Sequence, residues 1–271
     1  MIPGNDPETA RVRVGLSLGG GAARGFAHVG VLTVLEREGL RPSLVAGSSI
    51  GAVVGALFCS GRKADEIYEL MLKQSPSMSS FLFTSFRPQP IEQRFRDTFG
   101  SRTFESLSVP LIVTITDVVS GKTLFVKEGP VADALVASTR IPIVFPPVIK
   151  DDRILVDGGL LCNLPVSILR ESGADRVLAV DIGYIGLAEF ERPQGKFQMA
   201  CRCLDLLGRI PMHLEAEKAD LVLSPKVLDD TALDFQKAEK FYKMGLEAAE
   251  ANLDRIRTLW SPTQYHGHPC P

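Results

Sequence analysis

The stretch VAGSSIGAVVGAL, residues 45–57, places two serines between two glycines, with apolar residues on either side. Its first part reads as a buried strand and its last part as a buried helix. GSSIG has the pattern Gly-x-Ser-x-Gly, which exposes the central serine when it forms the turn between a strand and a helix. Ser49 is therefore the candidate nucleophile, and Gly47 and Gly51 are the small residues that a sharp turn needs. The alternative is a turn that only connects two elements.

Strand and helix patterns alternate on both sides of this stretch. Short apolar runs predict strands at 12–18, 44–46, 111–118, 123–126, 177–182 and 221–223. Apolar residues three or four apart predict helices at 24–38, 50–59, 131–138 and about 235–256. No linker rich in Pro, Gly or Ser divides the chain, so we expect one α/β domain, residues 11–260, with a mostly parallel sheet and helices on both faces. Residues 1–10 and 261–271 are expected to be flexible tails.

The composition is that of an ordinary globular protein. Of 271 residues, 45% are hydrophobic and 23% are charged, which suffices for one large domain or two small ones. The formal charge of −2 and the lack of a basic stripe give no reason to expect nucleic acid as a partner. The N-terminal residues lack the apolar core of a signal peptide, and no apolar run approaches the roughly 20 residues of a membrane span. The five cysteines fit no zinc-binding spacing, so we expect reduced thiols in a cytoplasmic protein with no metal and no cofactor.

Residues 62–99 interrupt the alternation of strands and helices. They have little strand character and carry Phe81, Phe83 and Phe86 among small polar residues. We expect an insertion packed on the body of the domain. A mobile apolar flap over a site is the alternative, and these phenylalanines would then be the side chains that contact a lipid surface.

The run GGGAARG, residues 19–25, follows a predicted strand and precedes a predicted helix. Its spacing does not fit a dinucleotide-binding fingerprint, in which Arg24 would have to be a glycine, and no Lys-Ser/Thr pair follows as in a phosphate loop. What remains is a series of unshielded backbone N–H groups at a helix N-terminus, which favour negative charge on a bound anion or on a reaction intermediate. A glycine-rich turn that only allows tight packing is the alternative.

A third motif is DGG in the stretch ILVDGGLLCNLPV, residues 154–166. Asp157 ends a predicted strand, and Gly158 and Gly159 let the chain turn away. An aspartate in this position is either a turn former or an acid–base group that faces a cleft at the end of the sheet.

The three motifs, in this order, resemble those of the patatin-like phospholipases, in particular the small single-domain bacterial members. The resemblance extends over about Val12 to Ile256 and includes VASTRIPIVFPPV before the DGG motif and ADLVLSPKV near the end. It implies a single-domain, three-layer α/β/α patatin-like fold with a mostly parallel central sheet. Two departures are mild: Ser48 replaces the usual Thr, and Ile50 replaces a small residue and is expected to narrow the cleft.

The resemblance also implies a serine hydrolase that cleaves carboxylic esters of phospholipids, lysophospholipids or related fatty acyl esters through a Ser–Asp dyad and an acyl-enzyme. Ser49 is then the nucleophile and Asp157 the proton acceptor. The oxyanion hole is then formed by the backbone amides of Gly19, Gly20 and Gly21, with the guanidinium group of Arg24 close by. The implied partner is a lipid or acyl-ester substrate, reached by transient contact of a cytoplasmic protein with a membrane surface. The resemblance implies no oligomeric state.

Two other functions stay open. A Ser–Asp–His triad, as in α/β-hydrolases, needs a histidine after the aspartate, and His213 has that order. We nevertheless expect no histidine to take part, because His213 lies in a polar amphipathic stretch, His28 follows the glycine run, and His266 and His268 lie in the C-terminal tail. A non-catalytic module that binds a lipid or an anion would use the glycine run alone.

Overall fold

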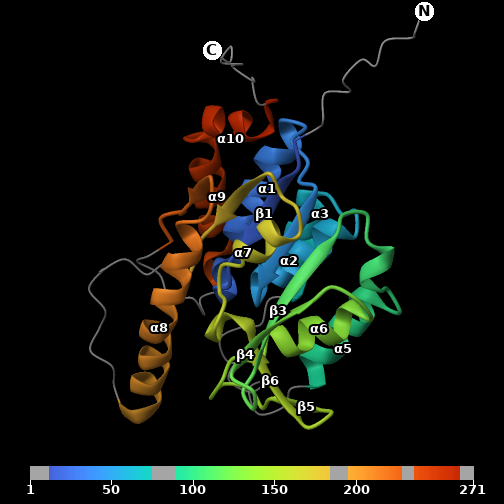
Figure 1. The fold of residues 1–271 in the computed structure, drawn as a ribbon, viewed down its shortest axis with the longest axis vertical. Coiled ribbons are helices and arrows are strands. Elements are labelled where there is room, and N and C mark those ends of the chain that lie inside the picture. Colours follow the sequence, from blue (N-terminus) through green and yellow to red (C-terminus); the bar gives the residue numbers. More distant parts are fainter. Residues whose placement is uncertain (1–11, 75–88, 184–194, 228–234, 263–271) are drawn as a thin grey trace, which may run out of the picture.

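The computed structural model describes residues 12–74, 89–183, 195–227 and 235–262 (Figure 1). Their strands form one sheet in the order β5-β6-β3-β2-β1-β7-β8, with β4 paired to β3. The strands are β1 (Val14–Leu18), β2 (Leu44–Ser48), β3 (Leu111–Asp117), β4 (Lys122–Val126), β5 (Val148–Lys150), β6 (Arg153–Asp157), β7 (Arg176–Val180) and β8 (Leu221–Leu223). Strands β3, β2, β1, β7 and β8 are parallel neighbours, whereas β4, β6 and β5 join through antiparallel pairs.

Helices cover both faces of the sheet. The longer ones are α1 (Phe26–Arg37), α2 (Ile50–Cys59), α3 (Ala64–Gln74), α5 (Gln89–Phe99), α6 (Val131–Ser138), α7 (Ser167–Glu171), α8 (Gly195–Ala216), α9 (Ala238–Glu250) and α10 (Leu253–Trp260). Alternate residues of β7 enter two different cores, as the period of a strand requires. Leu178 and Val180 pack in the core that contains α1, α2 and α9, whereas Val177 and Ala179 pack with Leu169 of α7. The three-layer α/β/α arrangement with a mostly parallel sheet is thus confirmed.

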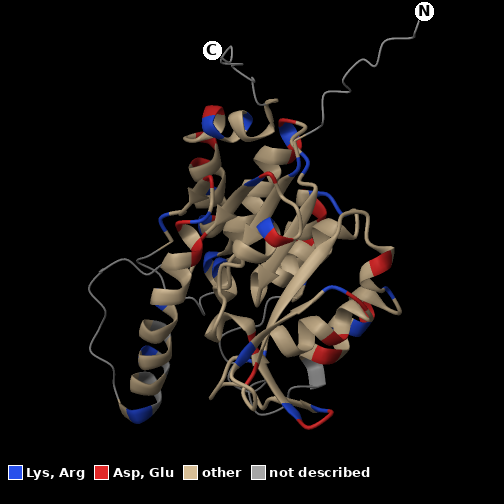
Figure 2. Ribbon diagram, viewed as in Figure 1, with Lys and Arg blue, Asp and Glu red and all other residues tan. Residues whose placement is uncertain are grey.

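The two central strands of the sheet carry no charged residue. All residues of β1 and β2 are buried and none is charged, so the Lys, Arg, Asp and Glu residues in Figure 2 lie on the helices, the loops and the outer strands. A parallel sheet with helices on both faces requires such strands, because neither face meets water. The polar groups needed for chemistry must therefore lie at the ends of the strands.

Helix α9 packs directly on α1 through two glycines. A Cβ atom on Gly30 would lie on the carbonyl oxygen of Tyr242, and one on Gly245 would lie on the carbonyl oxygen of Ala27. The two backbones touch, and only residues without a side chain allow this approach. The contact holds the C-terminal part of the chain against the helix that follows the glycine run.

Gly245→Ala is expected to lower the free energy of unfolding by about 1–3 kcal/mol, because the added methyl group forces α1 and α9 apart. Urea unfolding would measure the loss. Glu247→Ala, on the exposed face of α9, is the matched control and is expected to change stability by no more than about 0.5 kcal/mol. Equal stabilities of the two variants would contradict the close contact.

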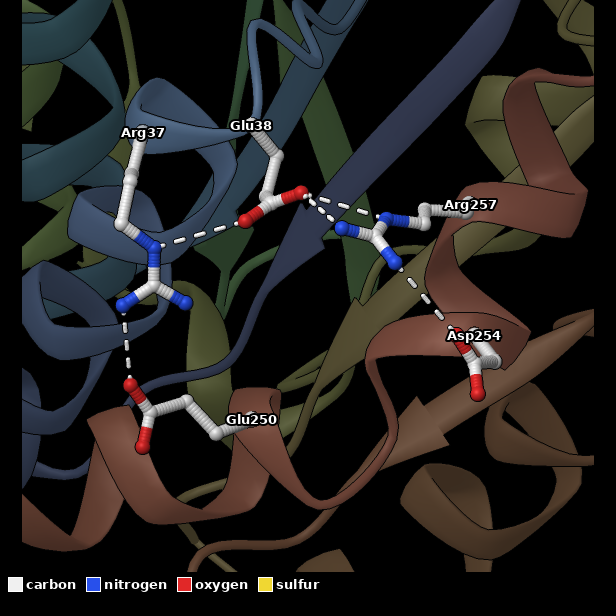
Figure 3. A network of polar contacts seen from close by, with 5 residues as sticks. All are labelled: Arg37, Glu38, Glu250, Asp254 and Arg257. Carbon is white, nitrogen blue, oxygen red and sulfur yellow. Dashed lines mark hydrogen bonds and ion pairs between the residues drawn. The ribbon is translucent and has the colours of Figure 1, made fainter.

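An ion-pair network supports the same region (Figure 3). Glu38, just after α1, accepts from Arg257 of α10 at 2.6 Å and from Arg37 at 3.4 Å. Arg37 also donates to Glu250 of α9 at 2.9 Å, and Arg257 reaches Asp254 at 3.5 Å. The two arginines are about half-exposed, so each pair contributes little alone, and the network mainly fixes the orientation of the last two helices.

The structure differs from the sequence prediction near the C-terminus. The single helix expected at about 235–256 is a short 3₁₀ turn, η4 (Phe235–Lys237), followed by α9 and α10 with a break at Ala251 and Asn252. The Asn252 side chain donates to the carbonyl oxygen of Ala248 at 2.9 Å, a local bond that competes with helix continuation.

The expected insertion at 62–99 is helical in its described parts, α3 and α5. Phe81, Phe83 and Phe86, and nearly all of the two expected tails, lie outside the described residues. Within the described ranges, no helix is both long and apolar enough to cross a lipid bilayer.

Candidate active site

Strand β3 brings two of the three sequence motifs together. Thr114 pairs with Ser48, the last residue of β2, and the next residue, Ile115, pairs with Asp157, the last residue of β6. Because β2 is parallel to β3 and β6 is antiparallel to it, the C-terminal ends of β2 and β6 meet beside the middle of β3. Ser49, which directly follows β2, therefore lies next to Asp157.

Ser49 occupies a strained turn. Its backbone has φ 51° and ψ −124°, a left-handed conformation that residues with a side chain seldom adopt. The chain can bend so sharply because its neighbours are glycines. A Cβ atom on Gly51 would lie on the carbonyl oxygen of Leu18, and one on Gly47 would lie 2.6 Å from the backbone nitrogen of Ala52. The geometry is that of a serine exposed at the junction of a strand and a helix.

The two adjacent serines have different environments. The backbone N–H of Ser49 donates to the Ser138 hydroxyl of α6 at 3.0 Å, and its side chain lines a pocket. Ser48 is fully buried at the end of β2, and its hydroxyl has no hydrogen-bond partner among the described residues. Of the two hydroxyl groups, only that of Ser49 faces the pocket.

Asp157 is buried beside Ser49. Its backbone N–H donates to the carbonyl oxygen of Arg140 at 2.9 Å, and its Oδ1 accepts from the N–H of Gly159 at 2.8 Å. Burial raises the pKa of the carboxyl group to about 6, although the Ser49 hydroxyl and the Gly159 N–H lower it in part. Oδ2 makes no well-aligned hydrogen bond within the described residues, so Ser49 is near the carboxyl group without being fully aligned with it. Such looseness is common in active sites without substrate.

Gly158 allows the backbone to turn sharply after Asp157, close to β3. A Cβ atom at this position would collide with the side chain and backbone of Thr114. The Thr114 hydroxyl lies 3.4 Å from the carbonyl oxygens of both Gly47, in the serine motif, and Cys162, just after the DGG turn, and its proton is shared between them. Thr114 therefore connects the serine turn to the DGG turn, η3 (Gly158–Leu160).

The glycine run lies on the third side of the site and leads into η1 (Ala22–Gly25). The N–H of Gly19 donates to the Val180 carbonyl oxygen of β7 at 3.0 Å, which continues the sheet. The N–H of Gly20 donates to Oδ1 of Asn163 at 3.1 Å. The N–H of Gly21 has no hydrogen-bond partner among the described residues. The donors that an anion could use are therefore Gly21 directly and Gly20 after release from Asn163, whereas Gly19 is committed to the sheet.

His28 and Arg24 are buried behind and beside this run. The fully buried imidazole of His28 has its pKa lowered to about 4, mainly by desolvation, so it is neutral at pH 7. Its Nε2–H donates to the carbonyl oxygen of Gly19 at 2.7 Å and holds the loop in place. Arg24 is 4% exposed and lines the pocket, which puts a permanent positive charge next to the glycine amides.

Asn163 is a site residue that the sequence motifs did not reveal. Its Oδ1 accepts from the Gly20 N–H, and its Nδ2 donates to the Gly20 carbonyl oxygen at 3.3 Å and approaches the Met212 sulfur at 3.6 Å. One side chain thus connects the chain after the DGG turn to the glycine run and to α8. Its only signal in the sequence is its position shortly after DGG.

These residues surround one pocket with a volume of about 280 Å³. Its polar side chains are those of Ser49, Asp157, Asn163, Arg24 and Arg209. The remaining lining consists of glycines and of apolar residues from the loop after α6, from η3 and from α8. The pocket thus combines a buried hydroxyl–carboxyl pair, two arginine side chains and apolar walls.

Two expectations about other residues can be compared with this geometry. Ile50 packs on Gly25, where a Cβ atom would collide with it, and it does not line the pocket; the expectation that it narrows the cleft is wrong. His213 is about three-quarters exposed on α8, lies 3.5 Å from Glu217 and does not line the pocket either. His266 and His268 lie outside the described residues.

Comparison with known proteins gives a consistent result. A family model described as patatin-like phospholipase matches residues 16–170. An uncharacterized NTE family protein of Mycobacterium tuberculosis is 36% identical over 179 residues, which cover 63% of this chain and 49% of that protein. Lysophospholipase NTE1 of Scheffersomyces stipitis is 28% identical over 282 residues, which cover 92% of this chain and 18% of that protein. This chain thus spans about half the length of the first relative and under a fifth of the second.

Comparison with solved structures also finds a related fold. The crystal structure of VipD from Legionella pneumophila superposes with a TM-score of 0.56 at 13% sequence identity, over 91% of this chain and 67% of that one. At this level of identity the likeness concerns the fold alone.

Proposed function

The chain belongs to the patatin-like phospholipase family, and we propose that it is a lipid acyl hydrolase that uses Ser49 as nucleophile and Asp157 as proton acceptor. Its proposed substrates are carboxylic esters of phospholipids, lysophospholipids or related fatty acyl esters. The observation that carries the proposal is the hydroxyl of Ser49, held in a strained turn beside the buried carboxyl group of Asp157 in a largely apolar pocket. We further propose that residues 11–260 form the catalytic domain.

The reaction would proceed in two displacements. The Ser49 oxygen attacks the ester carbonyl carbon while Asp157 takes the hydroxyl proton. Collapse of the tetrahedral intermediate breaks the bond to the alcohol, which leaves with the proton from Asp157. Water then attacks the acyl-enzyme, again giving its proton to Asp157, and releases the fatty acid and the free Ser49 hydroxyl.

An aspartate can act as this base because of its surroundings. At its ordinary pKa of about 3.9, a carboxylate is a weak base at pH 7. Burial raises the pKa of Asp157 to about 6, which improves proton transfer while leaving the group mostly ionised at neutral pH. The Gly159 N–H holds Oδ1, so Oδ2 remains for the serine proton.

The negative oxygen of the tetrahedral intermediate would face the glycine run. We assign the donors to the N–H groups of Gly20 and Gly21, with the charge of Arg24 close by. Gly19 serves differently: its N–H bonds to Val180 and its carbonyl oxygen to His28, so it anchors the loop. One oxyanion-hole donor typically contributes about 2.7–4 kcal/mol to transition-state stabilisation.

Gly21→Ala is expected to lower kcat by about tenfold to a hundredfold with little change in KM, because a shifted donor weakens binding of the transition state more than of the substrate. The backbone φ of Gly21 is 168°, outside the left-handed range, so the effect of the substitution depends mainly on the space around the added Cβ. The added Cβ lies 3.0 Å from the side chain of Ile182 and must move the loop slightly.

Gly55→Ala is the matched control for this substitution. Its Cβ meets Val45 Cγ1 at 3.2 Å, a similar crowding on α2 outside the pocket, and activity is expected to stay within about twofold of the wild type. If Gly21→Ala instead raised KM and left kcat unchanged, the result would favour the alternative in which the glycine run only allows tight packing.

Labelling with a fluorophosphonate probe tests the proposed function. We expect one covalent adduct on Ser49, found by peptide mass spectrometry, that is absent in Ser49→Ala and retained in Ser48→Ala. An adduct on another serine, or none on a folded protein that still hydrolyses esters, would refute the assignment. Absence of both labelling and hydrolysis would favour the non-catalytic binding module.

A further inference from the structure

Helix α8 runs along the side of the molecule (Figure 1). One of its faces lines the candidate active site. Leu204, Gly208 and Met212 line the pocket and are four residues apart, so they lie on one face of the helix. Met212 is buried and also contacts Asn163. The inner face of α8 is thus a wall of the pocket that contains Ser49 and Asp157.

The other face of α8 is apolar and exposed. It carries large side chains that are between 45% and 71% exposed, those of Met199, Leu206, Leu207, Ile210 and Leu214. Their spacings of three, four and seven residues place them in one stripe, roughly opposite the pocket face. We call this set the α8 stripe. Among the described residues, no helix or strand covers it, and contiguous apolar surface of this kind marks an interaction site.

Basic residues accompany the α8 stripe. Lys196 is exposed at the start of the helix, and Arg202 is partly exposed on one flank of the stripe. Arg209, seven residues further on, lies on the same flank, but its side chain lines the pocket. Helix α8 contains three basic residues and two acidic ones, Asp205 and Glu215, so it carries a net charge of +1 in a chain whose formal charge is −2. The Glu215 carboxylate is mostly buried and accepts from Ser167, away from the stripe. An apolar stripe with basic flanks is the pattern of helices that lie in the surface of an anionic membrane.

We propose that the α8 stripe docks on an anionic phospholipid surface, so that only the width of this helix separates the pocket from that surface. The inference rests on the proposed lipid hydrolase function. Docking through the stripe would bring the lipid close to the active site. An acyl ester that leaves the lipid surface beside α8 would pass from the outer face of this helix to its inner face, where the pocket contains Ser49. The apolar lining of the pocket suits the acyl chain along this path.

A second copy of the chain is the rival occupant, and the charges disfavour it. In a two-fold contact, the same patch faces itself, so the basic residues beside the stripe, Lys196 and Arg202, would lie near the same residues of the other copy. An anionic surface instead complements them. The α8 stripe also differs from the phenylalanines at 81, 83 and 86 that the sequence suggested for lipid contact, because it lies within the described structure, on the helix whose other face lines the pocket.

Vesicle sedimentation tests the proposal. The probes are vesicles of phosphatidylcholine alone and of three parts phosphatidylcholine to one part phosphatidylglycerol. We expect the wild type to bind the vesicles with phosphatidylglycerol more strongly than those without it. The double variant Leu207→Ser/Ile210→Ser should bind the phosphatidylglycerol vesicles at least about tenfold more weakly than the wild type. Hydrolysis of a vesicle-borne ester should fall with binding, whereas hydrolysis of a water-soluble short-chain ester should stay within about twofold, since neither residue lines the pocket.

Ile149→Ser is the matched control, since Ile149 is a 76% exposed isoleucine on β5, away from α8 (Figure 1). It is expected to bind vesicles as the wild type does. Equal loss in this control, or unchanged binding by the double variant, would overturn the proposal. So would light scattering that shows a wild-type dimer and a monomeric double variant.

The two proposals can fail separately. A wild type that binds anionic vesicles through Leu207 and Ile210 but hydrolyses neither ester would support the docking surface and refute the proposed function. A wild type that hydrolyses the soluble ester while the double variant binds vesicles unchanged would refute the docking surface alone.

Discussion

Replacing Ser49 by alanine is expected to lower ester hydrolysis by about four to six orders of magnitude and to leave the fold intact. In the proposed mechanism, the Ser49 hydroxyl supplies the covalent step, and Ser48 cannot replace it, because the Ser48 side chain is fully buried. The backbone bond from residue 49 to Ser138 does not involve the lost oxygen, so the turn should persist. Initial rates with a soluble fatty acyl ester, with circular dichroism as the folding check, would measure the effect.

Ser48→Ala is the control for this substitution and should keep activity within about tenfold of the wild type. The reverse pattern, in which Ser48→Ala is inactive and Ser49→Ala retains turnover, would show that the nucleophile is assigned to the wrong serine.

Ser49→Gly separates the catalytic role of this residue from its backbone strain. Both variants lack the hydroxyl, but only glycine adopts φ 51° without strain. The strain at such a residue is about 1–3 kcal/mol, and glycine loses about 0.5–1 kcal/mol through the flexibility of its unfolded chain. Ser49→Gly should therefore be more stable than Ser49→Ala by about 1 kcal/mol in urea unfolding. Equal stability would mean that the turn stores no strain.

The central layers of the fold follow from local patterns. The predicted strand at 111–118 and helices at 50–59 and 131–138 agree with β3, α2 and α6 to within a residue, because each is a buried run between strong breakers. Helix α8 was not predicted. One of its faces lines a pocket and another is exposed, yet both are apolar, so its sequence has no single hydrophobic side and no clear period.

The candidate site could be predicted only in part, for a similar reason. The motifs at 47–51 and 157–159 are local and can be read from residue types. Their meeting depends on consecutive residues of β3, Thr114 and Ile115, pairing with two distant strands, one parallel and one antiparallel. The bond from Asn163 to Gly20 likewise depends on tertiary contact, so no spacing rule points to it.

Asp157→Asn is expected to lower kcat by about 10²–10⁴-fold, whereas His213→Ala should keep most of the activity. Asparagine preserves the shape and can still accept from the Gly159 N–H, but it cannot take the proton of Ser49. The exposed imidazole of His213 does not line the pocket. Both variants should be assayed in parallel at pH 8. Loss of activity in His213→Ala with retention in Asp157→Asn would establish a Ser–Asp–His triad instead.

The pH profile of kcat/KM should rise through about pH 6 and level off above it, because the proposed base, Asp157, can accept a proton only when ionised and burial raises its pKa to about 6. The profile cannot identify the base by itself, since an ordinary histidine titrates near pH 6.5. The fall in activity at acid pH should therefore be read together with the two variants.

Stability gives an independent measure of the same carboxyl group. Burial raises the pKa of Asp157 in the folded state from 3.8 to about 6, so between these values the folded state binds more protons than the unfolded state. The free energy of unfolding must therefore fall as pH rises from about 4 to 6, by up to about 3 kcal/mol for a shift of about two pKa units. Asp157→Asn removes this term, and its unpaired NH₂ group adds a loss that does not depend on pH. In urea unfolding, the stability of Asp157→Asn relative to wild type should thus increase from pH 4 to pH 7. A pH-independent difference would mean that the carboxyl group is not desolvated, and Asp157 would then lack the basicity that the proposed dyad requires.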